Sequence, residues 1–257
     1  MLFVVILSIF GGDFGVSWRG LWLWGAVMVL VFLGMNGVYI RNYRLVTLLE
    51  REDWPALALY LEDRVIKQGR YASLLVGLLA NTYLVLSDYH AVMQLERKTA
   101  GVKPRLVDAY ALIFGTARIL EKEYEEAAYF FEGKIGKAKP GTADWLRWYS
   151  GFAQLLNGRG NPAADRFIII AQEGGNPVLA GLSAYFLAEI LPGIVPARSA
   201  EFTAAAMAGR KRVCAALPVQ DVWNKKVDKI RCEVYAAVLS HYLDETSKWL
   251  YTKENLP

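Results

Sequence analysis

The chain has 257 residues, enough to bury a sizeable core, and a formal net charge of only +4 at pH 7. That charge is too mild to indicate nucleic-acid binding by itself. The two cysteines, Cys214 and Cys232, are too few and too far apart for a disulfide framework or a cysteine-based metal site. Hydrophobic residues make up 54%, and the excess lies in residues 1–40, where Asp13 and Arg19 are the only charged side chains.

The strongest membrane signal is Leu21–Ile40, a run of residues without any charge. At about 1.5 Å rise per residue, such a helix crosses a hydrocarbon core of roughly 30 Å. Aromatic residues flank both ends, as in interfacial belts: Trp18, Trp22, Trp24, Tyr39 and Tyr43. We therefore predict a transmembrane helix over residues 19–42.

Residues 1–18 form a short apolar, membrane-associated segment with three possible roles. As a helix, Met1–Phe10 reaches only about 15 Å. It is half of a shallow membrane hairpin turned at Gly11 and Gly12, or it packs against another membrane subunit, or it is a cleaved signal. The last role fits least well, because the segment has no basic start.

The basic residues predict the orientation of the span. Arg41, Arg44 and Arg51 follow it, and only Arg19 precedes it. Positive residues favour the inner side of a membrane, so the large domain is expected in the cytoplasm. A periplasmic or lumenal location is the alternative.

The rest of the chain follows a repeat. Trp54, Tyr89 and Tyr124 lie 35 residues apart, and an acid precedes each. A period in the mid-thirties indicates two-helix repeats stacked into a solenoid. Two copies also share a small residue in the first helix and an Ala and a Phe in the second: Gly115, Ala127 and Phe131, then Gly151, Ala163 and Phe167.

Periodic apolar residues and breakers predict the individual helices. The first repeat opens at about residue 43 without a Gly/Ser tether, so the membrane helix is expected to continue into it. Further helices are expected at 54–68, 73–86, 88–101 and 107–120, and from Tyr124 and Pro162. Residues 177–209 form a degenerate fifth unit, and 219–250 an amphipathic stretch with a break inside it.

These residues resemble the tetratricopeptide repeat family over about residues 43–175, most clearly at 107–135. The resemblance implies an all-α fold: the N-terminal transmembrane helix, an α-solenoid of about four to five repeats over 43–209, and C-terminal capping helices over 210–257. Leu57 and Val92 depart from the family, because they replace the usual Ala.

In that family the first helices line a partner-binding groove. The corresponding residues here are mostly apolar and lack a basic clamp: Leu74, Asn81, Leu112, Thr116, Trp145, Trp148, Tyr149 and Phe152. An apolar helix or an extended apolar peptide suits such a groove, with its aromatic residues as anchors. The alternative is that the C-terminal helices fold back and fill it.

A second candidate surface is a basic patch of seven cations: Arg210, Lys211, Arg212, Lys225, Lys226, Lys229 and Arg231. It faces anionic lipid or an acidic partner, or it is simply a solvated surface. Nothing around it resembles a nucleic-acid-reading module.

No catalytic constellation is evident in the sequence. His90 and His241 have no partner at metal-ligand spacing, and neither a phosphate loop nor a nucleophile elbow occurs. We expect neither an enzyme nor a cofactor nor a metal. The sequence instead predicts a membrane-anchored adaptor or scaffold that holds a partner protein in a membrane complex. The alternative is a structural subunit that assembles through its convex face and residues 1–18.

Overall fold

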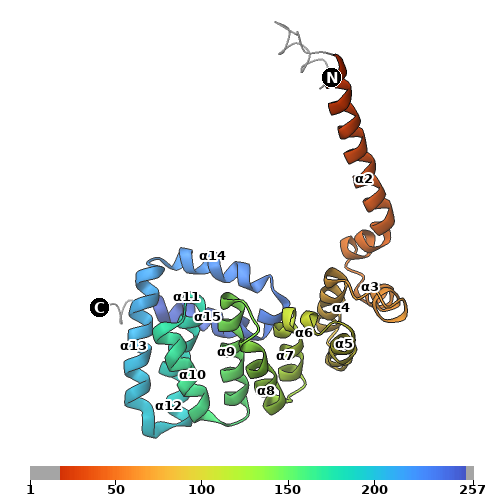
Figure 1. Cartoon of the computed structure of the whole chain (residues 1–257). Coiled ribbons are helices and arrows are strands. Elements are labelled where there is room, and N and C mark those ends of the chain that lie inside the picture. Colours follow the sequence, from red (N-terminus) through yellow and green to blue (C-terminus); the bar gives the residue numbers. More distant parts are fainter. Residues whose placement is uncertain (1–17, 253–257) are drawn as a thin grey trace, which may run out of the picture. The chain divides into compact units, whose positions relative to one another are not determined.

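The computed structural model describes residues 18–252, and every regular element among them is helical (Figure 1). The all-α prediction is confirmed for this part of the chain, and the predicted segment 1–18 lies almost entirely outside it. The α-helices are α2 (Trp18–Glu50), α3 (Trp54–Glu62), α4 (Ser73–Val85), α5 (Tyr89–Val102), α6 (Pro104–Ala109), α7 (Ala111–Leu120), α8 (Tyr124–Ile135), α9 (Pro140–Leu156), α10 (Gly160–Glu173), α11 (Pro177–Tyr185), α12 (Leu191–Ile194), α13 (Ser199–Ala216), α14 (Gln220–Arg231) and α15 (Ser240–Tyr251). The π- and 3₁₀-segments are η1 (Asp63–Lys67), η2 (Phe186–Ile190), η3 (Pro196–Arg198) and η4 (Val234–Leu239).

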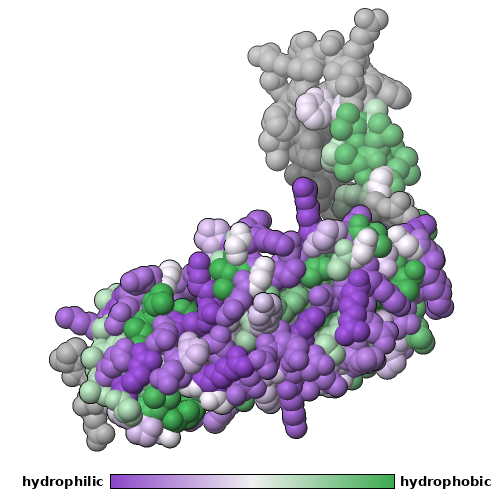
Figure 2. Space-filling model, turned by 60° about the horizontal axis from the view of Figure 1, so that its bottom comes forward, coloured by the Kyte–Doolittle hydropathy of each residue, from purple (hydrophilic) through white to green (hydrophobic). Residues whose placement is uncertain are grey.

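The chain divides into two compact units, residues 1–57 and 58–257. In the first, α2 exposes large apolar side chains between Trp24 and Tyr43, among them Phe32 and Ile40. Aliphatic side chains of this kind are green in Figure 2. The helix bends by 63° between Gly37 and Asn42. The prediction of a helical continuation into the first repeat is therefore confirmed, but the continuation is bent.

Two stretches of the described residues pass the length and hydropathy test for a membrane span. One is the bent pair in α2, Trp24–Gly37 with Asn42–Glu50, and the other is Pro177–Ile194. The second stretch is 56% buried within the protein and contains the fully buried Leu179 and Leu187. Its apolar character therefore follows from packing in the core.

The 35-residue repeat is visible in the backbone conformation of the turns. A residue with positive φ ends the first helix of each pair, and these residues lie 35 or 36 positions apart: Glu52, Ser87, Lys122 and Gly158. The amide of the following residue donates to the carbonyl five positions earlier, as in Asp88 N to Tyr83 O and Glu123 N to Arg118 O, both 2.9 Å. This pattern is the Schellman motif, which allows a helix to stop in a single turn. The 35-residue spacing thus repeats one backbone turn.

Small residues let the two helices of a pair approach closely. A Cβ atom on Gly115 would overlap the ring of Phe131, and one on Gly151 would lie 3.2 Å from the ring of Phe167. Both phenylalanines are fully buried. The shared small residues of the two repeats thus lie where the helices of a pair approach closely.

The third repeat differs from its prediction, because the expected helix at 107–120 breaks into α6 and α7 at Tyr110. The Tyr110 hydroxyl donates to the Ser73 carbonyl at 2.8 Å, and its ring lies against Gly77, where a Cβ would be only 2.6 Å away. The break therefore lets Tyr110 reach into the preceding repeat.

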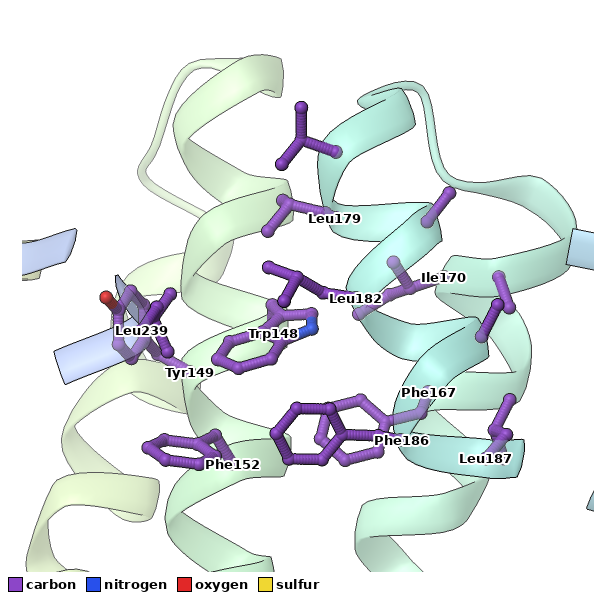
Figure 3. Close-up of a cluster of buried hydrophobic side chains, with 14 of the residues drawn as sticks. Trp148, Tyr149, Phe152, Phe167, Ile170, Leu179, Leu182, Phe186, Leu187 and Leu239 are labelled. Atoms are coloured by element: carbon purple, nitrogen blue, oxygen red, sulfur yellow. The ribbon is translucent and has the colours of Figure 1, made fainter. Parts of the chain in front are cut away.

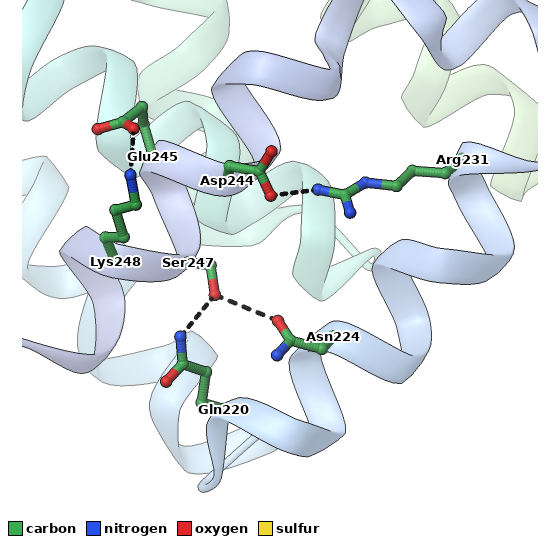
Figure 4. A network of polar contacts seen from close by, with 7 residues as sticks. All are labelled: Gln220, Asn224, Arg231, Asp244, Glu245, Ser247 and Lys248. Atoms are coloured by element: carbon green, nitrogen blue, oxygen red, sulfur yellow. Dashed lines mark hydrogen bonds and ion pairs between the residues drawn. The ribbon is translucent and has the colours of Figure 1, made fainter.

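The C-terminal stretch breaks as predicted, into α14, η4 and α15. A polar network joins α14 to α15 (Figure 4). In it, Ser247 bonds to Gln220 and to Asn224, and Arg231 pairs with Asp244. These contacts hold the two helices as one C-terminal element on the repeats.

Candidate docking surfaces

The aromatic residues expected to line an open groove lie in the core. Trp148 and Tyr149 on α9 are fully buried, and Trp145 and Phe152 are almost so. Figure 3 shows Trp148 and Phe152 packed among the side chains of α10, α11 and η2, with Leu239 of η4 beside Tyr149. Thr116 on α7 is also buried.

The C-terminal element covers this part of the groove. The Tyr149 hydroxyl donates to the Tyr235 carbonyl at 2.6 Å, and the ring of Trp145 lies edge-on to that of Tyr235. Phe152 packs against Tyr242 of α15 in the same edge-on manner. These side chains therefore do not form the open groove that the sequence analysis expected; the filled groove, its alternative, is the arrangement found.

Burial also changes the acidity of the covered groups. Loss of hydration raises the pKa of Tyr149 well above its usual value and that of Tyr235 to about 12. Both phenols therefore stay neutral to a higher pH than an exposed tyrosine does. The filled groove carries no charge from them.

The remaining predicted groove residues lie nearer the start of the repeats. Leu74, in the first turn of α4, is 67% exposed, and Asn81 and Leu112 are half-buried. Leu74 is thus the apolar groove position that stays most accessible.

The predicted basic patch divides into structural and exposed members. Arg210 is 4% exposed and donates to the Leu250 carbonyl at 2.8 and 3.2 Å, and Arg212 donates to the Ile170 carbonyl at 3.1 Å. The prediction that these two form a docking surface is corrected, because their guanidinium groups tie helix ends together. Arg231 is exposed but pairs with Asp244. The lysines of the predicted patch are all exposed: Lys211, Lys225, Lys226 and Lys229.

Exposed apolar side chains also occur on the second helices of the repeats. They are Leu59 on α3, Tyr129 on α8, Ile169 on α10 and Met207 on α13, with exposures from 50% to 81%. They lie on four different helices. These residues are not among the predicted site residues, although the repeat register places Leu59 and Tyr129 seventy residues apart at equivalent positions.

One cavity of about 220 Å³ opens between η1 and α5 in the described part of the chain. Glu62 and Lys98 line it, and Tyr83 donates from its hydroxyl to the Glu62 carboxylate at 2.8 Å. No group of three or more potential metal ligands occurs among the described residues. His90 and His241 are both exposed. The residues that line this cavity do not pair a nucleophile with a base.

Fold and surfaces together define an all-helical protein of stacked helix pairs with an exposed apolar N-terminal helix. Residues 91–252 match the family described as "Uncharacterised Treponema protein", and the chain belongs to that family. It is also 28% identical over 246 residues to a protein of Treponema pallidum (strain Nichols) described as an uncharacterized protein, covering 92% of this chain and 78% of the relative. No solved structure matches the chain.

Proposed function

We propose that this protein is a membrane-anchored, tetratricopeptide-like adaptor or scaffold that holds a partner protein in a membrane complex. The observation that carries the proposal is the apolar surface of α2, where Trp24, Phe32 and Ile40 are exposed to at least two thirds. Such a surface is costly in water and favourable in lipid. The helix runs from Trp18 to Glu50 and bends by 63° between Gly37 and Asn42.

The proposed orientation places residues 58–257 in the cytoplasm, with the periplasm as the alternative. Cys232 provides a native probe, because it is a free, exposed thiol. We expect a membrane-impermeant thiol reagent to label Cys232 in inside-out membrane vesicles and not in right-side-out vesicles. A Cys232→Ser variant controls for labelling at Cys214. Labelling in right-side-out vesicles alone would reverse the orientation, and loss of the protein from alkaline-washed membranes would exclude the anchor.

The proposed partner surface is the uncovered part of the groove around Leu74. It suits an apolar helix or peptide, because Leu74 is apolar and Asn81 and Leu112 are uncharged. Leu74→Glu tests this surface, and Leu59→Glu is a matched control, since the two leucines are 67% and 68% exposed. Crosslinked membranes are then purified through the full-length chain. Loss of the partner with Leu74→Glu alone supports the groove.

The second candidate function is a structural subunit that assembles through its convex face and residues 1–18. The exposed apolar residues on the second helices favour it, with Tyr129 the most exposed at 81%. Tyr129→Glu and removal of residues 1–18 are expected to reduce the size of the detergent-extracted particle in light scattering. An unchanged monomer in every case excludes self-assembly.

A further inference from the structure

The connections between helices lie at two edges of unit 58–257. Each second helix leads into the next first helix at one edge, and each first helix leads into its own partner at the other. Contacts between successive connections support this arrangement. The Lys103 ammonium donates to the Tyr71 carbonyl at 2.9 Å, which joins neighbouring connections at the first edge. Arg198 joins the α12–α13 connection to Asp165 near the start of α10 at the second.

The two edges differ in charge. At the first edge the connections are 68–72, 103, 136–139, 174–176 and 217–219, and none of them contains an Asp or Glu. We call the exposed cations in or beside these connections the basic edge: Arg70, Lys103, Arg105, Lys137, Lys139 and Lys211, continued on α14 by Lys225, Lys226 and Lys229. Exposed acids nearby are fewer: Glu173 at the end of α10, Asp221 and Asp228 on α14, and Glu233 just after α14. Asp63, beside the first connection, is paired with Lys67.

Helix capping explains the charges of the opposite edge. Its acids lie at the starts of second helices, for example Asp88, which accepts from Ala91 N at 3.0 Å, and Glu125 in the first turn of α8. Carboxylates at a helix N-terminus are stabilising. Arg159, which lies there too, is paired with Glu125.

Capping does not explain the basic edge. Lys139 is the N-cap residue of α9, and Arg105 lies in the first turn of α6. A cation at a helix N-terminus opposes the helix dipole, so these positions cost local stability. Neither residue has an ion-pair partner among the described side chains. Their charge therefore does not stabilise the helices, and it is available to a ligand outside the chain.

We propose that the basic edge binds the headgroups of anionic phospholipids and so holds the repeats against the bilayer surface. This inference rests on the proposed membrane anchor, which keeps the edge at a high effective concentration near lipid. Cations act on an anionic bilayer within a Debye length, about 8 Å at physiological ionic strength. Lysine carries its charge on a flexible four-carbon stem, so exposed lysines on separate connections suit a fluid layer of headgroups better than one fixed ligand.

The test uses the full-length protein reconstituted into vesicles of phosphatidylcholine alone or of phosphatidylcholine mixed with phosphatidylglycerol. A neutral amine reagent labels lysines, and mass spectrometry gives the rate at each site. Lys137, Lys139, Lys225 and Lys226 report on the basic edge, and Lys122 on the opposite edge is the internal control. We expect a several-fold slower rate at the basic edge relative to Lys122 in anionic vesicles only, with the difference removed by high salt.

Equal ratios in the two vesicle types would overturn the proposal. A Lys137→Glu/Lys139→Glu variant is expected to weaken the protection of Lys225, and a Lys122→Glu variant to leave it unchanged. Resistance of the protein to alkaline extraction is measured on the same vesicles. Failure to insert contradicts the membrane anchor, whereas insertion without lipid-dependent protection contradicts the basic edge alone.

Discussion

Gly115→Ala tests the interlock between the helices of one repeat. A methyl group at this position meets the ring of Phe131, which cannot easily move because it is fully buried and stacks on Tyr149 at a centroid distance of 5.5 Å. Overpacking of this kind costs about 1–3 kcal/mol, and the better helix propensity of Ala returns about 1 kcal/mol. We therefore expect a net loss of up to about 2 kcal/mol.

Gly133→Ala is the matched control, because a Cβ at Gly133 on α8 has no neighbour within 4 Å. The same chemical change should there stabilise the protein by up to about 1 kcal/mol. For a domain of this size, 1 kcal/mol shifts Tm by about 2–4 °C. Thermal melts followed by circular dichroism should therefore move in opposite directions for the two variants. An equal rise in both would refute the interlock.

Three further outcomes follow from particular contacts. Lys122→Gly should raise the free energy of unfolding by about 1 kcal/mol, because Lys122 has a φ of 67°, a conformation that favours glycine. Gly158→Ala, in the equivalent turn, should lower it, and urea titrations measure both changes. Arg210→Met should cost about 1.5–3 kcal/mol through its lost carbonyl bonds, against less than about 0.5 kcal/mol for the exposed Lys211→Met. Folding raises the pKa of Tyr149, so its contribution to the free energy of unfolding is fully present below about pH 10 and is progressively lost above it. Tyr149→Phe should therefore reduce the fall of the urea midpoint at alkaline pH.

The repeats were predictable because their signals are local. Spacing alone located the turns at Ser87 and Lys122. Gly115 in mid-helix indicated a close approach of two helices, and the structure shows Phe131 as the side chain that it meets. The left-handed turn residues themselves carried little signal, since only Gly158 has the residue type that this conformation favours.

The covering of the groove was not predictable, because it joins residues far apart in the chain. Tyr149 and Tyr235 are 86 positions apart, and the bond ends on a backbone carbonyl, which has no sequence signature. The burial of Arg210, by contrast, could have been predicted from the sequence. The spacing of Phe202, Ala206 and Val213 puts Arg210 on the buried face of α13, and charge alone led to its assignment as surface.

The C-terminal element has a consequence for how the protein unfolds. In a simple array of repeats each unit contacts only its neighbours, so the ends can fray while the middle stays folded. Here η4 packs against α4 and α7, and its Tyr235 contacts α9, so the C-terminal element contacts several earlier repeats at once. An array that would otherwise unfold stepwise thereby becomes a single cooperative unit.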